Sequence, residues 1–236
     1  MCADFGRLRE EIALLDAAGA DMFHIDIMDG EFVPNFAMSW GDVNAIRIAT
    51  HKPLGVHLMV NNPAIHLPHA YKNNVNVIYV HYEVGNTESY LKEIKESGVE
   101  AGLAVNPDTE LSEFQSLLPL VDHLLVMRVQ PGFAGSAPVP EVEHKLHQLT
   151  KIKGRSFKIS LDGAVSPEVI EKWSKKGVKE FVIGTASEAF GEKRKGRSYF
   201  DIMKDLRVGK QSGVQTDSTQ NEDLLTLPHR IERKAG

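Results

Sequence analysis

Short apolar runs rich in valine and isoleucine alternate with helix-like stretches along most of this chain, and this alternation limits its fold more than any other feature. Most of the runs are apolar without strict alternation, which is typical of parallel strands covered on both faces. Helical patterns between them are clearest at residues 86–97 and 166–176. The predicted strands are residues 22–28, 54–60, 77–81, 101–105, 123–129, 157–161 and 181–183.

The number of strands narrows the fold class. Seven strands, each followed by a helical segment, come after one extra helix over residues 4–18, whereas a closed barrel of βα units needs eight strands. We therefore predict an α/β fold, a (β/α)8 TIM barrel that lacks its first strand. A seven-stranded open α/β sheet is the alternative. Residues 1–207 are expected to form one barrel catalytic domain, and residues 208–236 a disordered C-terminal tail.

Composition excludes several classes of function. The sequence of 236 residues has no apolar run of about 18 residues, so no membrane span is predicted. Its single cysteine allows no internal disulfide and favours a reducing, cytoplasmic location. A net charge of −5 argues against a general nucleic-acid binder, so an anionic ligand would need a local binding site.

Histidines and aspartates lie at the ends of three predicted strands. His24 and Asp26 are two residues apart and so point to the same side of their strand. With His57 and Asp162 they provide four ligands suited to one divalent metal ion such as Zn²⁺, Mn²⁺, Fe²⁺ or Co²⁺. The simpler interpretations are a hydrogen-bonded His–Asp pair, a core histidine and a turn-forming aspartate. Taken together, the four residues favour the metal site.

The two aspartates also predict a reaction. Asp26 and Asp162 are far apart in the sequence but can face one another across a barrel mouth. One carboxylate can remove a proton from one face of a substrate carbon while the other returns a proton to the opposite face. A metal ion would stabilise the enediolate that exists between these two steps. His81 and Glu83, at a fourth strand end, are candidates to hydrogen-bond the ligands.

Small residues follow three of the strands and predict a phosphate site. Loops after the last two strands and a helix N-terminus form the common phosphate site of barrels, and small residues let backbone N–H groups approach an anion. The residues concerned are Gly132, Phe133, Ala134, Gly135, Gly163, Ala164, Gly184 and Thr185. Met28, Met59 and Met127 also end strands; they either fill the core or form the wall of a dry pocket.

These motifs, in this order, resemble the ribulose-phosphate 3-epimerase family over residues 1–207. The matching stretches are His24 to Gly30, Phe32 to Asn35, His57 to Val60, Val126 to Met127, Pro131 to Gly135, Asp162 to Gly163, and Gly184 to Thr185. The resemblance implies a (β/α)8 barrel that interconverts D-ribulose 5-phosphate and D-xylulose 5-phosphate. Some of these sequence motifs also resemble the branch of the family that acts on D-allulose 6-phosphate.

The resemblance implies roles for individual residues. His24, Asp26, His57 and Asp162 match the metal ligands, and the two aspartates also match the acid/base pair. Met28, Met59 and Met127 match the methionines that cover the enediolate, and His57 also faces substrate. The glycine-rich loops named above match the phosphate contacts. A small phosphorylated ketose is thus the expected partner, and homo-oligomers are common in the family.

Several positions depart from the family pattern. The family begins with a strand that ends in Pro-Ser, whose serine touches substrate, and that strand would precede Met1 here. Gln130 replaces an acid, Ser136 a glutamine, and Ala164 a glycine or serine. Two alternatives follow: an impaired relative that binds a sugar phosphate without turnover, and an interaction protein that works through residues 209–236.

Overall fold

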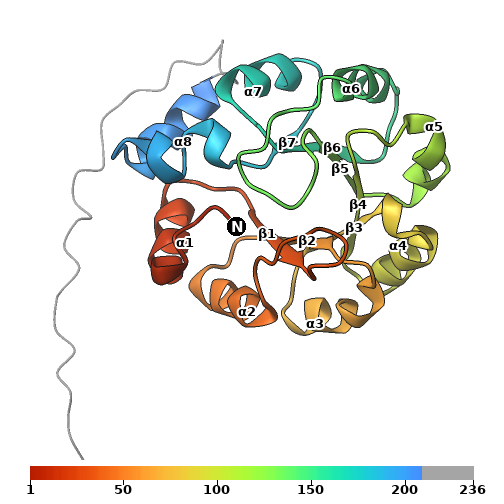
Figure 1. The fold of residues 1–236 in the computed structure, drawn as a ribbon, viewed down its shortest axis with the longest axis horizontal. Coiled ribbons are helices and arrows are strands. Elements are labelled where there is room, and N and C mark those ends of the chain that lie inside the picture. Colours follow the sequence, from red (N-terminus) through yellow and green to blue (C-terminus); the bar gives the residue numbers. More distant parts are fainter. Residues whose placement is uncertain (209–236) are drawn as a thin grey trace, which may run out of the picture.

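The computed structural model describes residues 1–208, and within them a parallel sheet is surrounded by helices (Figure 1). The strands are β1 (Phe23–Met28), β2 (Leu54–Met59), β3 (Val77–His81), β4 (Glu100–Val105), β5 (His123–Met127), β6 (Lys158–Asp162) and β7 (Glu180–Phe181). The helices are α1 (Leu8–Ala17), α2 (Trp40–Ala49), α3 (Leu67–Lys72), α4 (Thr87–Glu96), α5 (Leu111–Phe114), α6 (Val142–Thr150), α7 (Pro167–Ser174) and α8 (Tyr199–Val208). Each predicted strand is present, with its ends within two residues of the prediction.

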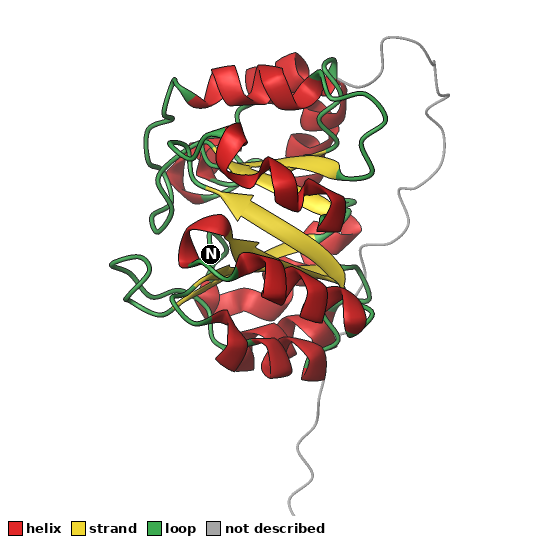
Figure 2. Ribbon diagram, turned by 90° about the vertical axis from the view of Figure 1, so that its right-hand side faces the viewer, coloured by secondary structure: helices red, strands yellow, loops and turns green. Residues whose placement is uncertain are grey.

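The strands pair in chain order from β1 to β7, and every pairing is parallel. The sheet curls, so that the helices form a ring around it when the molecule is viewed along the barrel (Figure 1), and the side view shows them packed outside the strands (Figure 2). The register places Asp26 opposite His57, and Met127 opposite Asp162. Residues that end different strands therefore meet at one rim of the sheet.

One side of the curled sheet is open. The end strands β1 and β7 each have a single strand partner among residues 1–208. A cavity of about 1210 Å³ lies between them and continues to α1 and α8, where Ile12 and Leu206 contribute to its lining. We refer to this region as the open side, and to β2–β6, which are paired on both edges, as the closed side. The prediction of a barrel-like α/β fold lacking one strand is confirmed.

Local signals in the sequence account for the loops that carry the site. Ser39 caps α2, and its side chain and that of Asp42 form a capping box. Ser166 caps α7 by accepting a hydrogen bond from the backbone of Val169, and Pro167 occupies the first helical position. These caps fix where the β1–α2 and β6–α7 loops end, and so hold both loops at the rim where the aspartates lie.

Two further predictions from the sequence concern a membrane span and the end of the barrel domain. Among residues 1–208, no helix is both long enough and apolar enough to cross a membrane. The boundary expected after residue 207 falls in the last turn of α8, which ends at Val208. The rest of the expected tail, residues 209–236, lies outside the described residues.

Candidate active site and metal centre

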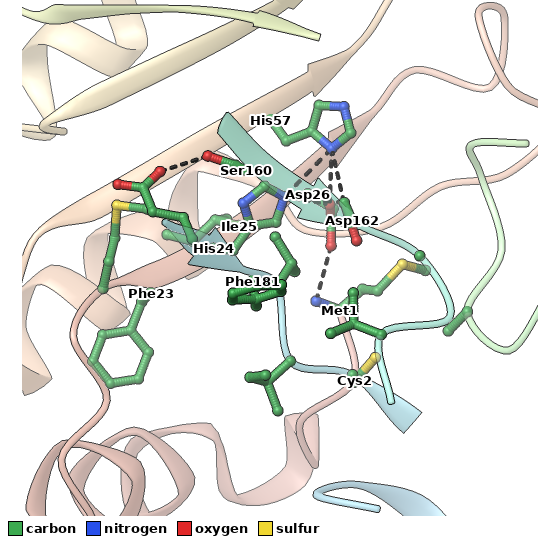
Figure 3. Close-up of a pocket in the computed structure, with 18 of the residues that line it drawn as sticks. Met1, Cys2, Phe23, His24, Ile25, Asp26, His57, Ser160, Asp162 and Phe181 are labelled. Carbon is green, nitrogen blue, oxygen red and sulfur yellow. Dashed lines mark hydrogen bonds and ion pairs between the residues drawn. The ribbon is translucent and has the colours of Figure 1, made fainter. Parts of the chain in front are cut away.

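Four side chains from three strands converge at the carboxyl ends of the sheet (Figure 3). His24 and Asp26 come from β1, His57 from β2 and Asp162 from the last position of β6. One potential ligand atom from each lies within 4.8 Å of the other three. The four residues proposed as ligands from the sequence are therefore brought together, and they could hold a metal ion.

The imidazoles lie between the two carboxylates. His24 Nε2 is 3.4 Å from Asp26 Oδ1 and 3.5 Å from Asp162 Oδ2. His57 Nδ1 is 3.3 Å from the same oxygen of Asp26 and 3.4 Å from His24 Nε2. The nitrogen that each histidine turns toward the cluster is thus defined: Nε2 for His24 and Nδ1 for His57.

The charges of the cluster favour a cation among these groups. Burial alone would lower the pKa of His24, but its hydrogen bonds to Asp162 and Asp26 outweigh burial and raise that pKa to about 9. Burial opposes ionisation of Asp26, yet the hydrogen bond from His24 and the positive charge of that imidazole hold the pKa of Asp26 well below its usual value. Two carboxylates and two imidazoles are a donor set that fits a divalent transition metal.

A buried chain of hydrogen bonds extends from His57 away from the cluster. His57 Nε2 is 2.8 Å from His81 Nε2, and His81 Nδ1 is 2.9 Å from Glu83 Oε2. Both imidazoles are fully buried. Burial lowers the pKa of His81 to about 4 despite the neighbouring Glu83 carboxylate, so this imidazole is neutral at physiological pH. The expectation that His81 and Glu83 support the ligands by hydrogen bonding agrees with this arrangement.

The predicted phosphate loops meet on the other side of the cavity. A Cβ atom built on Gly135 would lie 3.8 Å from Thr185 Oγ1, so the loops after β5 and β7 are adjacent. Gly163 has a φ of +90°, and a Cβ there would lie 2.5 Å from Val129 Cγ2. Only glycine fits that position without displacing its neighbour. All eight residues of these loops named from the sequence line the cavity.

Arg128 supports this region and was not singled out from the sequence. Arg128 is 6% exposed, and its Nη1 donates hydrogen bonds to the carbonyl oxygens of Gly163 at 3.2 Å and Ala164 at 2.6 Å. Ala164 adopts a left-handed conformation with a φ of +48°, which costs a non-glycine residue about 1 kcal/mol or more. Arg128 thus stabilises a strained loop. The sequence signal that could have identified Arg128 is its charge within the apolar run 123–129.

The three methionines line the cavity but belong to two packing groups. Met28 and Met59 pack with Val33 below the β1–α2 loop. Met127 packs with Tyr79 and other residues inside the barrel. Both interpretations made from the sequence therefore apply to the methionines: their side chains fill the core and also form apolar walls of the pocket.

A hydrogen bond joins two loops at the mouth of the site. Asn35 Nδ2 donates to the carbonyl oxygen of Gly132 at 2.7 Å, and Val33 packs against Gly132. Beside this bond, Phe36 is 74% exposed and Phe133 is 52% exposed. The β1–α2 and β5–α6 loops therefore present two aromatic rings at the rim, close to the cavity that holds the cluster.

The fold and site together define a class. A curled parallel sheet with its polar residues at the carboxyl ends of the strands is the arrangement of barrel enzymes. Here that rim combines two carboxylates, two imidazoles and glycine-rich loops around one cavity. The arrangement suits proton transfer on a small anionic substrate.

Comparison with known proteins identifies the family. The model of the ribulose-phosphate 3-epimerase family matches residues 1–187. Ribulose-phosphate 3-epimerase from Synechocystis sp. is 38% identical over 193 residues, covering 79% of this chain and 84% of the relative. The chloroplastic ribulose-5-phosphate-3-epimerase of Arabidopsis thaliana is 34% identical over 217 residues, covering 89% and 75%. The chain belongs to the ribulose-phosphate 3-epimerase family, and it is an epimerase, an enzyme of the isomerase class.

Solved structures support the fold alone. The 3-keto-L-gulonate-6-phosphate decarboxylase from Vibrio cholerae aligns with a TM-score of 0.64 at 16% identity, over 86% of this chain and 91% of that one. A tryptophan synthase alpha-subunit from Pyrococcus furiosus aligns with a TM-score of 0.60 at 17% identity, over 85% and 89%. The seven-stranded sheet is therefore barrel-like in its overall course.

Proposed function

We propose that this protein inverts the configuration at C3 of a ketose phosphate, interconverting D-ribulose 5-phosphate and D-xylulose 5-phosphate. The observation that carries the proposal is the approach of Asp26 and Asp162, from different strands, to the same two imidazoles at the rim of the cavity. The names of the relatives supply the substrate class.

The two aspartates perform the proton transfers. One carboxylate removes the proton from C3 on one face, which leaves an enediolate across C2 and C3. The other carboxylate, as its acid, returns a proton to the opposite face. General acid–base groups of this kind contribute about 10²- to 10⁴-fold each.

One divalent ion (Zn²⁺, Mn²⁺, Fe²⁺ or Co²⁺) would be held by His24, Asp26, His57 and Asp162. When bound, such an ion acts as a Lewis acid that stabilises negative charge developing on substrate oxygens. The side chains themselves orient the acid/base pair, because each aspartate shares His24 as a hydrogen-bond partner.

The remaining predicted residues hold the substrate. The backbone N–H groups of Gly132 to Gly135, Gly163, Ala164, Gly184 and Thr185 bind the phosphate. Met28, Met59 and Met127 exclude water from the reacting carbons, and Phe133 at the rim lies over the substrate. We further propose that the enzyme works in the cytoplasm and as a homo-oligomer.

Proton exchange at C3 tests this proposal directly. The full chain, supplied with Zn²⁺, is incubated in D₂O with D-ribulose 5-phosphate or D-allulose 6-phosphate, and deuterium incorporation at C3 is followed by NMR. We expect incorporation into the pentulose phosphate, with formation of D-xylulose 5-phosphate. Incorporation into the hexulose phosphate alone would assign the enzyme to that other substrate.

Absence of exchange into either sugar would contradict the proposed activity. Thermal unfolding with and without each sugar phosphate then tests the alternative of an impaired relative, because a ligand that binds the folded state stabilises it. Stabilisation without exchange would identify a sugar-phosphate-binding relative that lacks turnover.

A further inference from the structure

The nitrogen of His57 that points away from the cluster determines whether the other nitrogen can bind a metal ion, because only one of the two carries the proton in the neutral ring. A neutral imidazole has one N–H group and one lone pair. His57 Nδ1 faces the carboxylates and His24, whereas Nε2 faces His81. Nδ1 can therefore serve as a metal ligand only when the proton of His57 is on Nε2.

The proton positions can be followed outward from that requirement. If His57 Nε2 donates, then His81 Nε2, 2.8 Å away, must accept with its lone pair. The proton of His81 is then on Nδ1, which donates to Glu83 Oε2 at 2.9 Å. An ionised carboxylate only accepts hydrogen bonds, so it ends the chain and fixes every proton in it.

The second oxygen of Glu83 is fixed independently. Glu83 Oε1 accepts a hydrogen bond from the backbone N–H of Asn106 at 2.8 Å and another from the hydroxyl of Thr109. Lys145, only 3% exposed, donates to the carbonyl oxygens of Asn106 at 2.6 Å and Pro107 at 3.0 Å. It thereby holds the loop after β4 in place. Both oxygens of the carboxylate thus face donors, and Glu83 cannot turn to offer a proton toward His81.

We propose that Glu83 and His81 are positioning residues that hold His57 in its Nε2–H tautomer before any metal binds, so that the Nδ1 lone pair is already directed at the ligand cluster. This inference rests on the metal site of the proposed function. Its measurements are proton positions and metal affinity, which are independent of turnover.

Replacement of Glu83 by glutamine places a donor in this chain. If the amide oxygen accepts from His81, the amide nitrogen meets the N–H of Asn106 and the hydroxyl of Thr109. If the amide nitrogen faces His81 instead, the proton of His81 moves to Nε2 and opposes the N–H of His57. The second arrangement drives the proton of His57 to Nδ1 and removes the ligand lone pair.

The wild-type protein provides the first test. Long-range ¹H–¹⁵N correlation NMR reports which nitrogen of each histidine carries the proton. We expect His57 as the Nε2–H tautomer and His81 as the Nδ1–H tautomer, both without metal and with Zn²⁺. A proton on His57 Nδ1 in the metal-free protein would overturn the proposal, because the metal rather than the chain would then select the tautomer.

Metal affinity provides the second test. We expect Glu83→Gln to weaken Zn²⁺ binding by about 10- to 100-fold, the usual effect of losing a partner behind a metal-bound histidine. Glu180→Gln is the matched control. It makes the same chemical change in another partly buried His–Glu pair, in which Glu180 Oε2 is 2.8 Å from His123 Nδ1, at the opposite ends of the strands.

The outcomes separate this inference from the proposed function. Weaker Zn²⁺ binding in Glu83→Gln, with wild-type affinity in Glu180→Gln, supports the positioning role. Equal affinity in all three proteins contradicts it, even where the wild type epimerises normally. A wild type that binds no Zn²⁺ but shows the expected tautomers contradicts the metal site instead. Should Glu83→Gln not fold, the tautomers of the wild type decide the matter.

Discussion

The two histidines of the site belong to two differently built sides of the barrel. His57 lies on β2, which is paired on both edges, and its second nitrogen is hydrogen-bonded to His81. His24 lies on β1 beside the cavity of the open side, and its Nδ1 is buried without a hydrogen-bond partner among residues 1–208. On the closed side, the hydrogen bond to His81 therefore orients His57 before any metal binds. On the open side, the orientation of His24 depends on the cluster itself.

The largest expected effect concerns the two aspartates, one on each side of this comparison. Asp26→Asn on β1 and Asp162→Asn on β6 should each lower C3 exchange about 10³-fold or more, because each removes one proton-transfer group. The measurement is the rate of deuterium incorporation, with circular dichroism as the control for folding. If either variant stays within tenfold of the wild type, the two-carboxylate mechanism is wrong.

Truncation of one apolar side chain should lower the free energy of unfolding more on the closed side than on the open side. Leu103→Ala on β4 removes a fully buried side chain and should lower the free energy of unfolding by about 2–5 kcal/mol. Ile183→Ala, next to the cavity and only partly buried, should cost about 1 kcal/mol or less because it enlarges existing space. Urea unfolding measures both. Equal losses would mean that the open side is packed as well as the closed side.

Metal should stabilise the fold by joining the two sides. At a Zn²⁺ concentration 100 times the dissociation constant, the free energy of unfolding should rise by about 2.7 kcal/mol. Hydrogen exchange should slow more in β1 than in β4, because β1 has one strand partner in the described chain and β4 has two. His24→Ala is the control and should lose most of the stabilisation. An unchanged unfolding transition would contradict metal binding.

The smallest expected effect concerns pH and the pair that ties β7 to β5. Burial lowers the pKa of His123, but its hydrogen bond and charge interaction with Glu180 outweigh burial and raise it. A raised pKa stabilises the fold below about pH 6.5, and this contribution is lost as pH rises through the folded value.

Glu180 shows the opposite dependence. Burial opposes its ionisation, but the hydrogen bonds from His123 and Ser160 lower its pKa, so its contribution is lost as acid protonates it. Glu180→Gln should reduce the free energy of unfolding near pH 6 by about 1 kcal/mol and flatten its decline as pH rises above about 6.5. Urea unfolding across this range measures it, and parallel profiles for variant and wild type would exclude the pair as the cause.

Much of the fold and the cluster could be predicted from the sequence because both depend on local patterns. Apolar runs locate the strands, and the strand ends locate His24, Asp26, His57 and Asp162. The hydrogen bond between His57 and His81 depends instead on the register and side-chain directions of two strands, and Glu83 meets Thr109 only through the loop after β4. Arg128 was missed for the same reason, since its partners are carbonyl oxygens about 35 residues away.

The open side also has a geometric consequence for the barrel that residues 1–208 form. In a closed barrel, the number of strands and their stagger set the diameter. Within residues 1–208 the sheet has six pairings in a row and forms a split ring, whose diameter is not set by hydrogen bonds around its full circumference. The candidate ligands come from β1, β2 and β6, so they lie on both sides of the split. A ligand that these side chains bind together therefore also sets the diameter of the barrel.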